Sequence, residues 1–285
     1  MNILEIVKEF LGPIDTPDII ICLLGFILFA LWLLRTSFGT RALENSPPRR
    51  NNMPLFLPFI LFIFSYGMII FAGFLAAKYF NSGPLWKIQI IDNVFNGLAG
   101  IIAIIIILIF SYVFFARGLK GFGLNIKTIH KDFLAAFLNL LAIWPILLVV
   151  VTLTVFFAKA MKGPDYQIPK HEELVSISEN SVLWVRIAIA VIAVIVTPIL
   201  EEFTFRGLLQ TTFRSVIRTK NAPWIAIAVT SIIFVMMHAN PTHWPTLFVL
   251  GVCLGYSYEK SGSLFRPIFI HAIFNAISVI GVLLQ

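Results

Sequence analysis

Val94–Ala116 reads VFNGLAGIIAIIIILIFSYVFFA and contains no charged side chain. A helix needs about 20 apolar residues to cross the hydrocarbon core of a bilayer. This run is long enough, and comparable runs recur from one end of the chain to the other. Of the 285 residues, 59% are hydrophobic and 12% are charged, against about 25% charged residues in an ordinary soluble domain. The sequence therefore predicts an all-α, polytopic membrane protein.

Eight apolar segments are long enough, or nearly so, to span a membrane. The sixth and seventh are short, so each is open to being broken, tilted or partly re-entrant. The eight segments are Ile19–Leu34, Pro54–Ala77, Val94–Ala116, Phe133–Ala158, Val182–Leu200, Ala222–Met237, Pro245–Tyr258 and Leu264–Leu284.

Basic residues gather in alternate connections between these segments. They are Arg35, Arg41, Arg49 and Arg50 after the first, Arg117, Lys120, Lys127 and Lys131 after the third, and Arg206, Arg214, Arg218 and Lys220 after the fifth. Because Lys and Arg are enriched in cytoplasmic loops, we expect these loops inside and both termini outside. The net charge of +7 then reflects topology. No nucleic-acid motif accompanies it, so no nucleic-acid partner is expected.

The chain divides near residue 181. Residues 1–180 carry few charges within their spans and are predicted to form an N-terminal transmembrane scaffold of unknown role. Residues 181–285 hold the intramembrane polar clusters and are predicted to form a transmembrane core that carries the chemistry of the protein. Lys159–Asn180, the most polar stretch, is expected to be an exposed connection or a surface helix.

The first polar cluster lies in Pro198–Gly207, PILEEFTFRG. Glu202 and Arg206 are four residues apart and favour an ion pair on one helix face. Glu201 points about 100 degrees away and has no local partner. Charged groups at the centre of a span cost about 2.5–3.5 kcal/mol each on insertion scales, so they usually have a function. The alternative is that all three side chains snorkel at a helix end.

Two further clusters contain histidine. His238 ends the segment FVMMH, which begins at Phe234, and a lone histidine on an apolar face is often only a satisfied core residue. His271 and Asn275 share a helix face, where they can also serve as interhelical glue worth about 0.6 kcal/mol per bond. Together, a glutamate, two histidines and an asparagine are the groups that metal-assisted or glutamate-assisted hydrolysis uses.

Three motifs thus stand in order: Glu201-Glu202-x-x-x-Arg206, Phe234-x-x-x-His238 and His271-x-x-x-Asn275. They resemble the motifs of the CPBP family, which groups type II CAAX prenyl proteases with bacteriocin-processing and abortive-infection membrane proteins. The resemblance covers about residues 195–280. It implies an eight-helix intramembrane endopeptidase, surrounded by membrane lipids, that cleaves a membrane-associated peptide or protein, prenylated or not.

The resemblance also implies roles by position. Glu201 would activate the attacking water as general base, and His238 would hold that water or a metal. His271 and Asn275 would stabilise the oxyanion or complete the site. Substrate contact or structural support would come from Glu202, Arg206 and Phe234.

No cofactor is required by the sequence. If a metal is used, the resemblance implies zinc held by Glu201, His238 and His271, which meets the minimum of three protein ligands for a catalytic site. The family is described both as zinc-dependent and as using glutamate without a catalytic metal. We expect no obligatory metal.

The expected depths of these residues conflict. Counting about 1.5 Å per residue, Glu201 and His271 fall near the cytoplasmic end of their spans, and His238 falls near the opposite end. Either the sixth span is displaced inward, with Lys220–Trp224 projecting into the cytoplasm, or it is a partial, tilted helix. With one of these, the site is expected nearer the cytoplasmic side of a multi-pass membrane protein, which would lie in the plasma membrane if the source is a prokaryote.

Two other classes of function are compatible with the residues. A non-catalytic immunity or scaffold protein would bind a bacteriocin or partner helices and would not need a general base. A transporter could use Glu201 and His238 as a proton relay, although inverted repeats and paired broken helices are not evident.

Overall fold

The computed structural model describes residues 16–46, 48–169 and 171–284, and this part of the chain contains helices and no strand. The expected all-α fold is confirmed. In the described residues, eight main helical segments correspond in position to the eight apolar segments. They are α2 (Thr16–Arg35), α3 (Leu57–Phe80), α4 (Leu85–Phe114), α6 (Ile129–Lys162), the composite helix Leu183–Val216, α11 (Ala222–Met236), α12 (Trp244–Ser261) and α13 (Phe265–Leu283).

Short elements connect or interrupt these segments. The connecting ones are α5 (Leu119–Phe122), η1 (Ile126–Thr128), α7 (Glu172–Glu179) and η4 (Pro241–His243). The composite helix consists of α8 (Leu183–Val191), the π-helical η2 (Ile192–Val196), α9 (Thr197–Glu202), the π-helical η3 (Phe203–Gln210) and α10 (Thr211–Val216).

Six helices of the described residues are long and apolar enough to cross a membrane, and α11 and α12 fall outside that set. Large apolar side chains such as Ile63 of α3 and Val113 of α4 are exposed. Apolar surface on this scale would be unstable in water and is suited to contact with lipid tails. The chain is an integral, multi-pass membrane protein.

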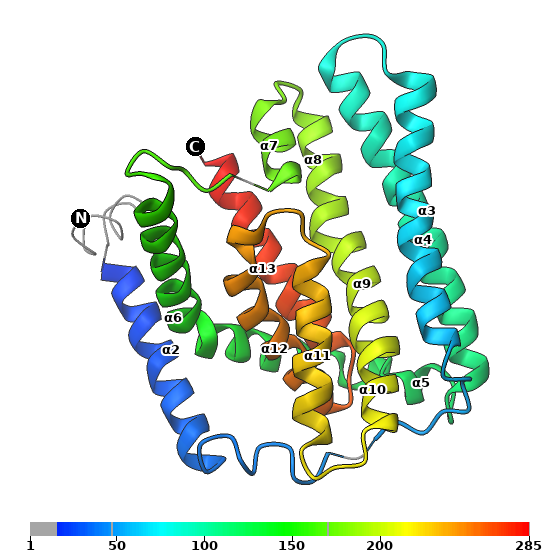
Figure 1. Cartoon of the computed structure of the whole chain (residues 1–285), viewed down its shortest axis with the longest axis vertical. Helices are drawn as coiled ribbons and strands as arrows, with labels where there is room; N and C mark the ends of the chain where they lie inside the picture. Colours follow the sequence, from blue (N-terminus) through cyan, green and yellow to red (C-terminus); the bar gives the residue numbers. More distant parts are fainter. Residues whose placement is uncertain (1–15, 47, 170, 285) are drawn as a thin grey trace.

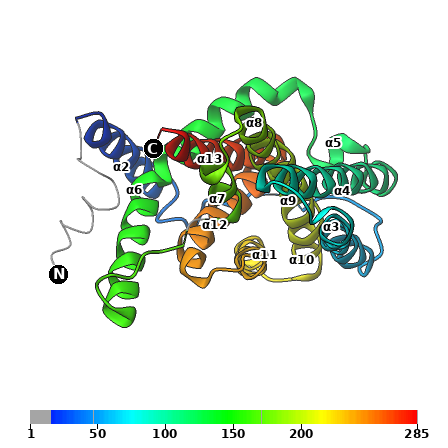
Figure 2. The ribbon, with the colours of Figure 1, turned by 90° about the horizontal axis from the view of Figure 1, so that it is seen from above.

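The helices form three groups side by side (Figures 1 and 2). α3 and α4 pack against each other on one side, and α2 packs against α6 on the other. Between them stand the composite helix, α11, α12 and α13. α6 contacts α12 and α13, and α3 and α4 contact η3 and α9. Both outer groups therefore support the central one.

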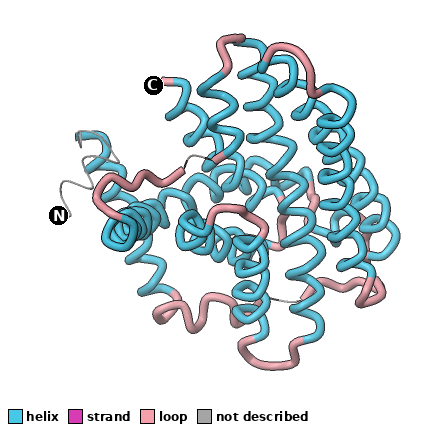
Figure 3. The backbone as a smooth tube through the Cα atoms, turned by 45° about the horizontal axis from the view of Figure 1, so that its top comes forward, coloured by secondary structure: helices cyan, strands magenta, loops and turns pink. Residues whose placement is uncertain are grey.

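Most loops lie at the two ends of the bundle (Figure 3). The connection from α2 to α3, the α5 region and the turn 217–221 share the lower end in Figure 1. They carry Arg41, Arg49, Arg50, Arg117, Lys120, Arg218 and Lys220. The α3–α4 turn and α7 lie at the opposite end. The structure thus places the basic connections together, which is what a cytoplasmic face requires.

This arrangement predicts the topology of the protein in intact cells. A cysteine introduced at Lys220 should be protected from a membrane-impermeant thiol reagent, and one at Ser82 in the α3–α4 turn should be labelled. The parent chain is the control, because Cys22 and Cys253 lie within α2 and α12. Labelling of Lys220→Cys from outside would show that the bundle is inserted the other way round.

Two expected boundaries were wrong for the same reason. The fifth span was expected to end at Leu200, but its helix continues to Val216. The third was expected to begin at Val94, but α4 begins at Leu85. In both places polar side chains interrupt the apolar run without ending the helix, because they face partners inside the protein. Glu201 therefore lies near the middle of a 34-residue helix and not at its end.

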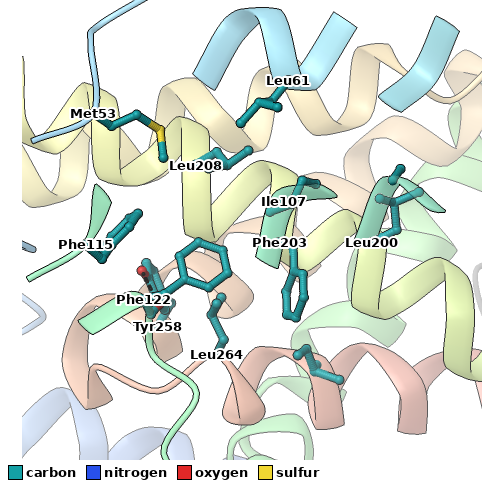
Figure 4. Close-up of a cluster of buried hydrophobic side chains, with 12 residues drawn as sticks. Met53, Leu61, Ile107, Phe115, Phe122, Leu200, Phe203, Leu208, Tyr258 and Leu264 are labelled. Atoms are coloured by element: carbon teal, nitrogen blue, oxygen red, sulfur yellow. Dashed lines mark hydrogen bonds between the residues drawn. The ribbon is translucent and has the colours of Figure 1, made fainter. Parts of the chain in front are cut away.

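A buried apolar cluster holds the composite helix in place (Figure 4). The ring of Phe122, from α5, lies 5.4 Å from the ring of Phe203 in η3. Gly207 leaves the space for it, since a Cβ there would lie 2.3 Å from Phe122 Cζ. The Tyr258 hydroxyl of α12 donates to the carbonyl of Phe122 at 3.1 Å. The α5 segment thus fixes the position of η3, directly after the first motif.

Candidate active site

The ring of Phe234 lies where the three motifs meet. Its centroid is 4.9 Å from that of the His238 ring and 5.9 Å from that of the His271 ring. The guanidinium carbon of Arg206 lies over the same ring, 4.8 Å from its centroid. Phe234 is fully buried. The three motifs are therefore adjacent in space, although 70 residues separate Glu201 from His271 in the chain.

The short length of α11 resolves the conflict of depth. Its 15 residues extend for about 22 Å, and it ends inside the bundle, well short of the end where α7 lies (Figure 1). His238 comes two residues later, and the chain turns back through η4 into α12. Of the two explanations, a partial helix is the one that the structure supports.

The carboxylate of Glu202 binds two helices together. Its Oε1 accepts hydrogen bonds from Arg206 Nη1 at 2.8 Å and from His271 Nδ1 at 2.9 Å. Glu202 is 0% exposed and Arg206 1%. A charge buried to this degree is stable only when it is paired and hydrogen-bonded. The expected Glu202–Arg206 pair is present, and the same oxygen positions the ring of His271.

That bond determines which nitrogen of His271 is available. A carboxylate only accepts, so Nδ1 carries the proton, and Nε2 of the neutral ring is left as an acceptor. Nε2 lies 3.6 Å from Glu201 Oε2. The side chain of Glu201 is 15% exposed, whereas that of Glu202 is 0% exposed. At this separation the two acceptors can share one proton, or both can accept from one water that lies beside the line joining them.

Asn275 hydrogen-bonds to the backbone of the composite helix. Its Nδ2 donates to the carbonyl of Ala193 at 2.9 Å. In η2 the backbone bonds run from residue i+5, as Thr197 N–H to Ile192 O shows. The corresponding donor to Ala193 would be residue 198, which is a proline and has no N–H. Asn275 supplies the missing hydrogen bond, and its role at the oxyanion stays a prediction.

Two glycines of α12 allow the first motif to approach closely. Arg206 Nη2 donates to the carbonyl of Gly251 at 3.3 Å, and Gln210 Nε2 donates to that of Gly255 at 3.0 Å. A Cβ at Gly251 would lie 3.1 Å from the Cβ of Ser231 in α11. Gly251-x-x-x-Gly255 therefore acts as a small-residue packing surface.

His238 contacts the site from one side. Its Nδ1 is 2.9 Å from the carbonyl of Phe234, an acceptor, so Nδ1 donates and Nε2 is left as an acceptor. No hydrogen bond joins His238 to Glu201 or His271 within the described ranges. In those ranges no group of three or more His, Cys, Asp or Glu side chains is arranged to hold a metal ion. That Glu201, His238 and His271 would hold a zinc ion stays a prediction.

Comparison with known proteins identifies the part of the chain that contains this site. Residues 183–277 match the family model described as type II CAAX prenyl endopeptidase Rce1-like. Residues 183–277 belong to the Rce1-like family. The match begins with α8 and includes all three motifs, so the resemblance to CPBP intramembrane proteases is confirmed. No curated protein and no solved structure matches the chain.

A polar cavity of about 300 Å³ adjoins Glu201 of the Rce1-like segment. Nine of its fourteen lining residues come from helices before that segment. These residues are Tyr66 and Ile69 of α3, Asp92, Asn93, Asn96, Gly97 and Gly100 of α4, and Glu173 and Ser176 of α7. Residues 1–180 thus contribute directly to the surroundings of the candidate base.

Sequence reasoning missed the polar residues of α4. Asp92 and Asn96 are four residues apart and share a face, and Asn96 Nδ2 donates to Asp92 Oδ2 at 3.2 Å. The spacing was visible in the sequence. It was passed over because the third span was expected to begin at Val94, which left Asp92 and Asn93 outside the membrane segment.

Helix α7 lies at the end opposite the basic loops (Figure 1). It contributes Glu173 and Ser176 to the wall of the cavity. Burial acts to raise the pKa of the Glu173 carboxyl, but the hydrogen bond and the charge of His171 outweigh burial, so that pKa lies below its usual range. The ring of His171 is 5.8 Å from that of His238. Glu173 and His171 thus link α7 to both the cavity and the second motif.

The buried ion pair of the Rce1-like segment predicts a large effect on stability. Arg206→Met leaves Glu202 buried without its cation and should lower the free energy of unfolding by about 3–5 kcal/mol. Arg218→Met, at an exposed position, should change it little. Denaturation of the purified variants in detergent measures both. Equal stabilities would show that Glu202 is compensated by His271 alone.

Proposed function

We propose that this protein is an intramembrane endopeptidase in which Glu201 activates the hydrolytic water. The family is one of endopeptidases, so hydrolysis of a peptide bond is the coarse activity of the chain. The observation that carries the finer proposal is the pair Glu201 Oε2 and His271 Nε2, 3.6 Å apart beside a polar cavity. A water that lies beside these two acceptors donates one hydrogen to each and directs its lone pair toward the cavity.

The reaction proceeds through a tetrahedral intermediate. The water oxygen bonds to the scissile carbonyl carbon, its proton passes to Glu201, and the carbonyl π electrons move to the oxygen. The intermediate then collapses, the C–N bond breaks, and Glu201 returns the proton to the leaving amine. A polar cavity is required for this step, because water must reach a site surrounded by apolar helices.

The other motif residues support these two groups. Glu202 and Arg206 hold His271 in the tautomer that leaves Nε2 as an acceptor. Asn275 holds the composite helix at Ala193. We retain His238 as a predicted site residue, because Nδ1 donation to Phe234 leaves its Nε2 as an acceptor facing away from that carbonyl.

We propose that catalysis has no obligatory metal. The proposal is supported by the arrangement of the described residues, among which no three His, Cys, Asp or Glu side chains converge as metal ligands. Metal analysis of purified protein, together with cleavage assays in the presence of a chelator, tests it. Loss of activity with a chelator, and its return with zinc, would require a metal.

A lipidated substrate fits a second cavity. This cavity, of about 380 Å³, is lined almost entirely by apolar side chains of α2, α6 and α12, Trp32, Ile143 and Val252 among them. An isoprenoid chain has the apolar surface that such a cavity accepts. We propose a prenylated peptide ending in Cys-a-a-X as the first probe, with the same peptide lacking the lipid as its comparison.

The second candidate is a non-catalytic immunity or scaffold protein. It is favoured by the fact that Glu202, Arg206 and His271 hydrogen-bond to one another within the protein. The two functions differ at Glu201, because a scaffold has no use for a partly exposed carboxylate beside a cavity.

Substitution at Glu201 decides between them. Glu201→Gln keeps the shape of the side chain and removes the base, so cleavage of the prenylated peptide should fall by about 10²–10⁴-fold. The matched control is Glu179→Gln, an exposed carboxylate of α7, which should retain full activity. Rates are measured on protein reconstituted in liposomes. Undiminished turnover by Glu201→Gln would rule out the assigned role.

A further inference from the structure

Two adjoining cavities lie between α2 and the central helices. The first is the apolar cavity of about 380 Å³ described above, which is lined by residues of α2, α6, α11 and α12. The second, of about 830 Å³, lies at the basic end of the bundle, between the turn that follows α2 and the start of α11 (Figure 1). We call the second cavity the mouth. Because Trp32 and Trp224 line both, the two cavities meet at these indole rings.

Aromatic contacts hold this junction in place. Trp32 Nε1 donates to the Tyr256 hydroxyl at 2.8 Å. The ring of Trp224 stacks on that of Tyr256, with centroids 5.9 Å apart and planes inclined by 12°. Rings from α2, α11 and α12 are thus held at one level. Trp and Tyr are enriched where the hydrocarbon of a membrane meets its headgroups, so this is the level at which a bound lipid would change from chain to headgroup.

The apolar cavity has nearly the depth of one leaflet. Along α12 it extends from Tyr256 to Phe248, which corresponds to about 12 Å of helix. Along α2 it extends from Trp32 to Leu28, again away from the basic end. The hydrocarbon core of a bilayer is about 30 Å thick, so each leaflet contributes about 15 Å. A chain that begins at the two indoles would therefore be enclosed through most of its own leaflet.

The mouth has a positive charge and hydrogen-bond donors. Its wall includes Lys220 and Asn221, which precede α11, and Trp224 in the first turn of that helix. Lys220 is exposed, and Asn221 makes no side-chain cap hydrogen bond at the start of α11. No acidic residue is among those that the structure describes along this wall. Ammonium, amide and indole N–H groups all donate hydrogen bonds, so the mouth is complementary to an anion such as a phosphate.

We propose that the two cavities form a binding site for an anionic glycerophospholipid, with its phosphate at Lys220 and an acyl chain in the apolar cavity. A free phosphate ion would use the mouth alone, whereas a lipid uses both cavities. Phe38, on the wall of the mouth, is 75% exposed and offers further apolar surface there. Basic pockets between transmembrane helices on the cytoplasmic side are known to bind such headgroups.

The inference does not depend on the function proposed above, because it concerns binding and not cleavage. The isoprenoid chain of a prenylated peptide would use the apolar cavity without the phosphate position in the mouth. Phospholipid and lipidated substrate would therefore exclude each other from this cavity.

Native mass spectrometry of the delipidated full-length protein in detergent tests the headgroup. Dioleoyl phosphatidylglycerol should bind more tightly than dioleoyl phosphatidylcholine, which has no net charge. Lys220→Gln should weaken binding of phosphatidylglycerol by about fivefold. The matched control is Lys120→Gln, which removes an exposed charge of α5 at the same end and should leave binding unchanged. Equal binding of the two lipids, or equal loss in the two variants, would show that overall charge alone attracts lipid and would overturn the proposal.

Chain length tests the apolar cavity on the unaltered protein, so this arm does not require any variant to fold. Dihexanoyl phosphatidylglycerol has the same headgroup and should bind more weakly than the dioleoyl lipid by more than about tenfold, because fewer CH₂ groups are buried. Glycerol 3-phosphate, which has no chain, should not bind at the same concentration. Binding that is unchanged by the loss of the chains would show a site for phosphate alone and would overturn the assignment to a lipid.

Discussion

One carboxylate oxygen, Oε1 of Glu202, accepts hydrogen bonds from Arg206 and His271 in an interior that excludes water. An unpaired charge at this depth would unfold the centre of the bundle, so the helices that supply the donors have fixed positions. The bond from Arg206 of η3 sets the rotation of the composite helix. The bond from His271 sets the distance between the composite helix and α13. When both hydrogen bonds are formed, the orientation of the neighbouring residue Glu201 is fixed as well.

The backbone of the composite helix adapts to this constraint. Its π-helical segments, η2 and η3, lie on either side of the Glu201–Glu202 pair. Such wide turns are rare and occur often at functional sites, where they redirect side chains. Pro198 removes one backbone donor beside the first of them, and Asn275 of α13 replaces it. The third motif thus supports the backbone of the composite helix through Asn275.

The helices before the Rce1-like segment do more than surround it. α5 packs Phe122 against Gly207, directly after the first motif. α3 and α4 provide Tyr66, Asp92 and Asn96 to the cavity wall. An apolar bundle could hold the motifs together without a polar wall. The polar wall adjoins Glu201, so the surroundings of the proposed base come from both parts of the chain.

The sequence by itself determined the fold class, the approximate positions of eight helices and the members of the three motifs. Those properties are local, because apolar length and i, i+4 spacing are written in consecutive residues. The Glu202–Arg206 pair, four residues apart, belongs to the same group. Only the tertiary structure decided the depth of His238, because α11 ends inside the bundle where a span was expected to continue. It also decided that Asn275 bonds to Ala193, that Asp92 and Tyr66 line the same cavity as Glu201, and that charged residues did not end the fifth helix. Each of these depends on contacts between helices far apart in the chain. A single segment does not reveal which polar groups are buried or which partners on other helices stabilise them.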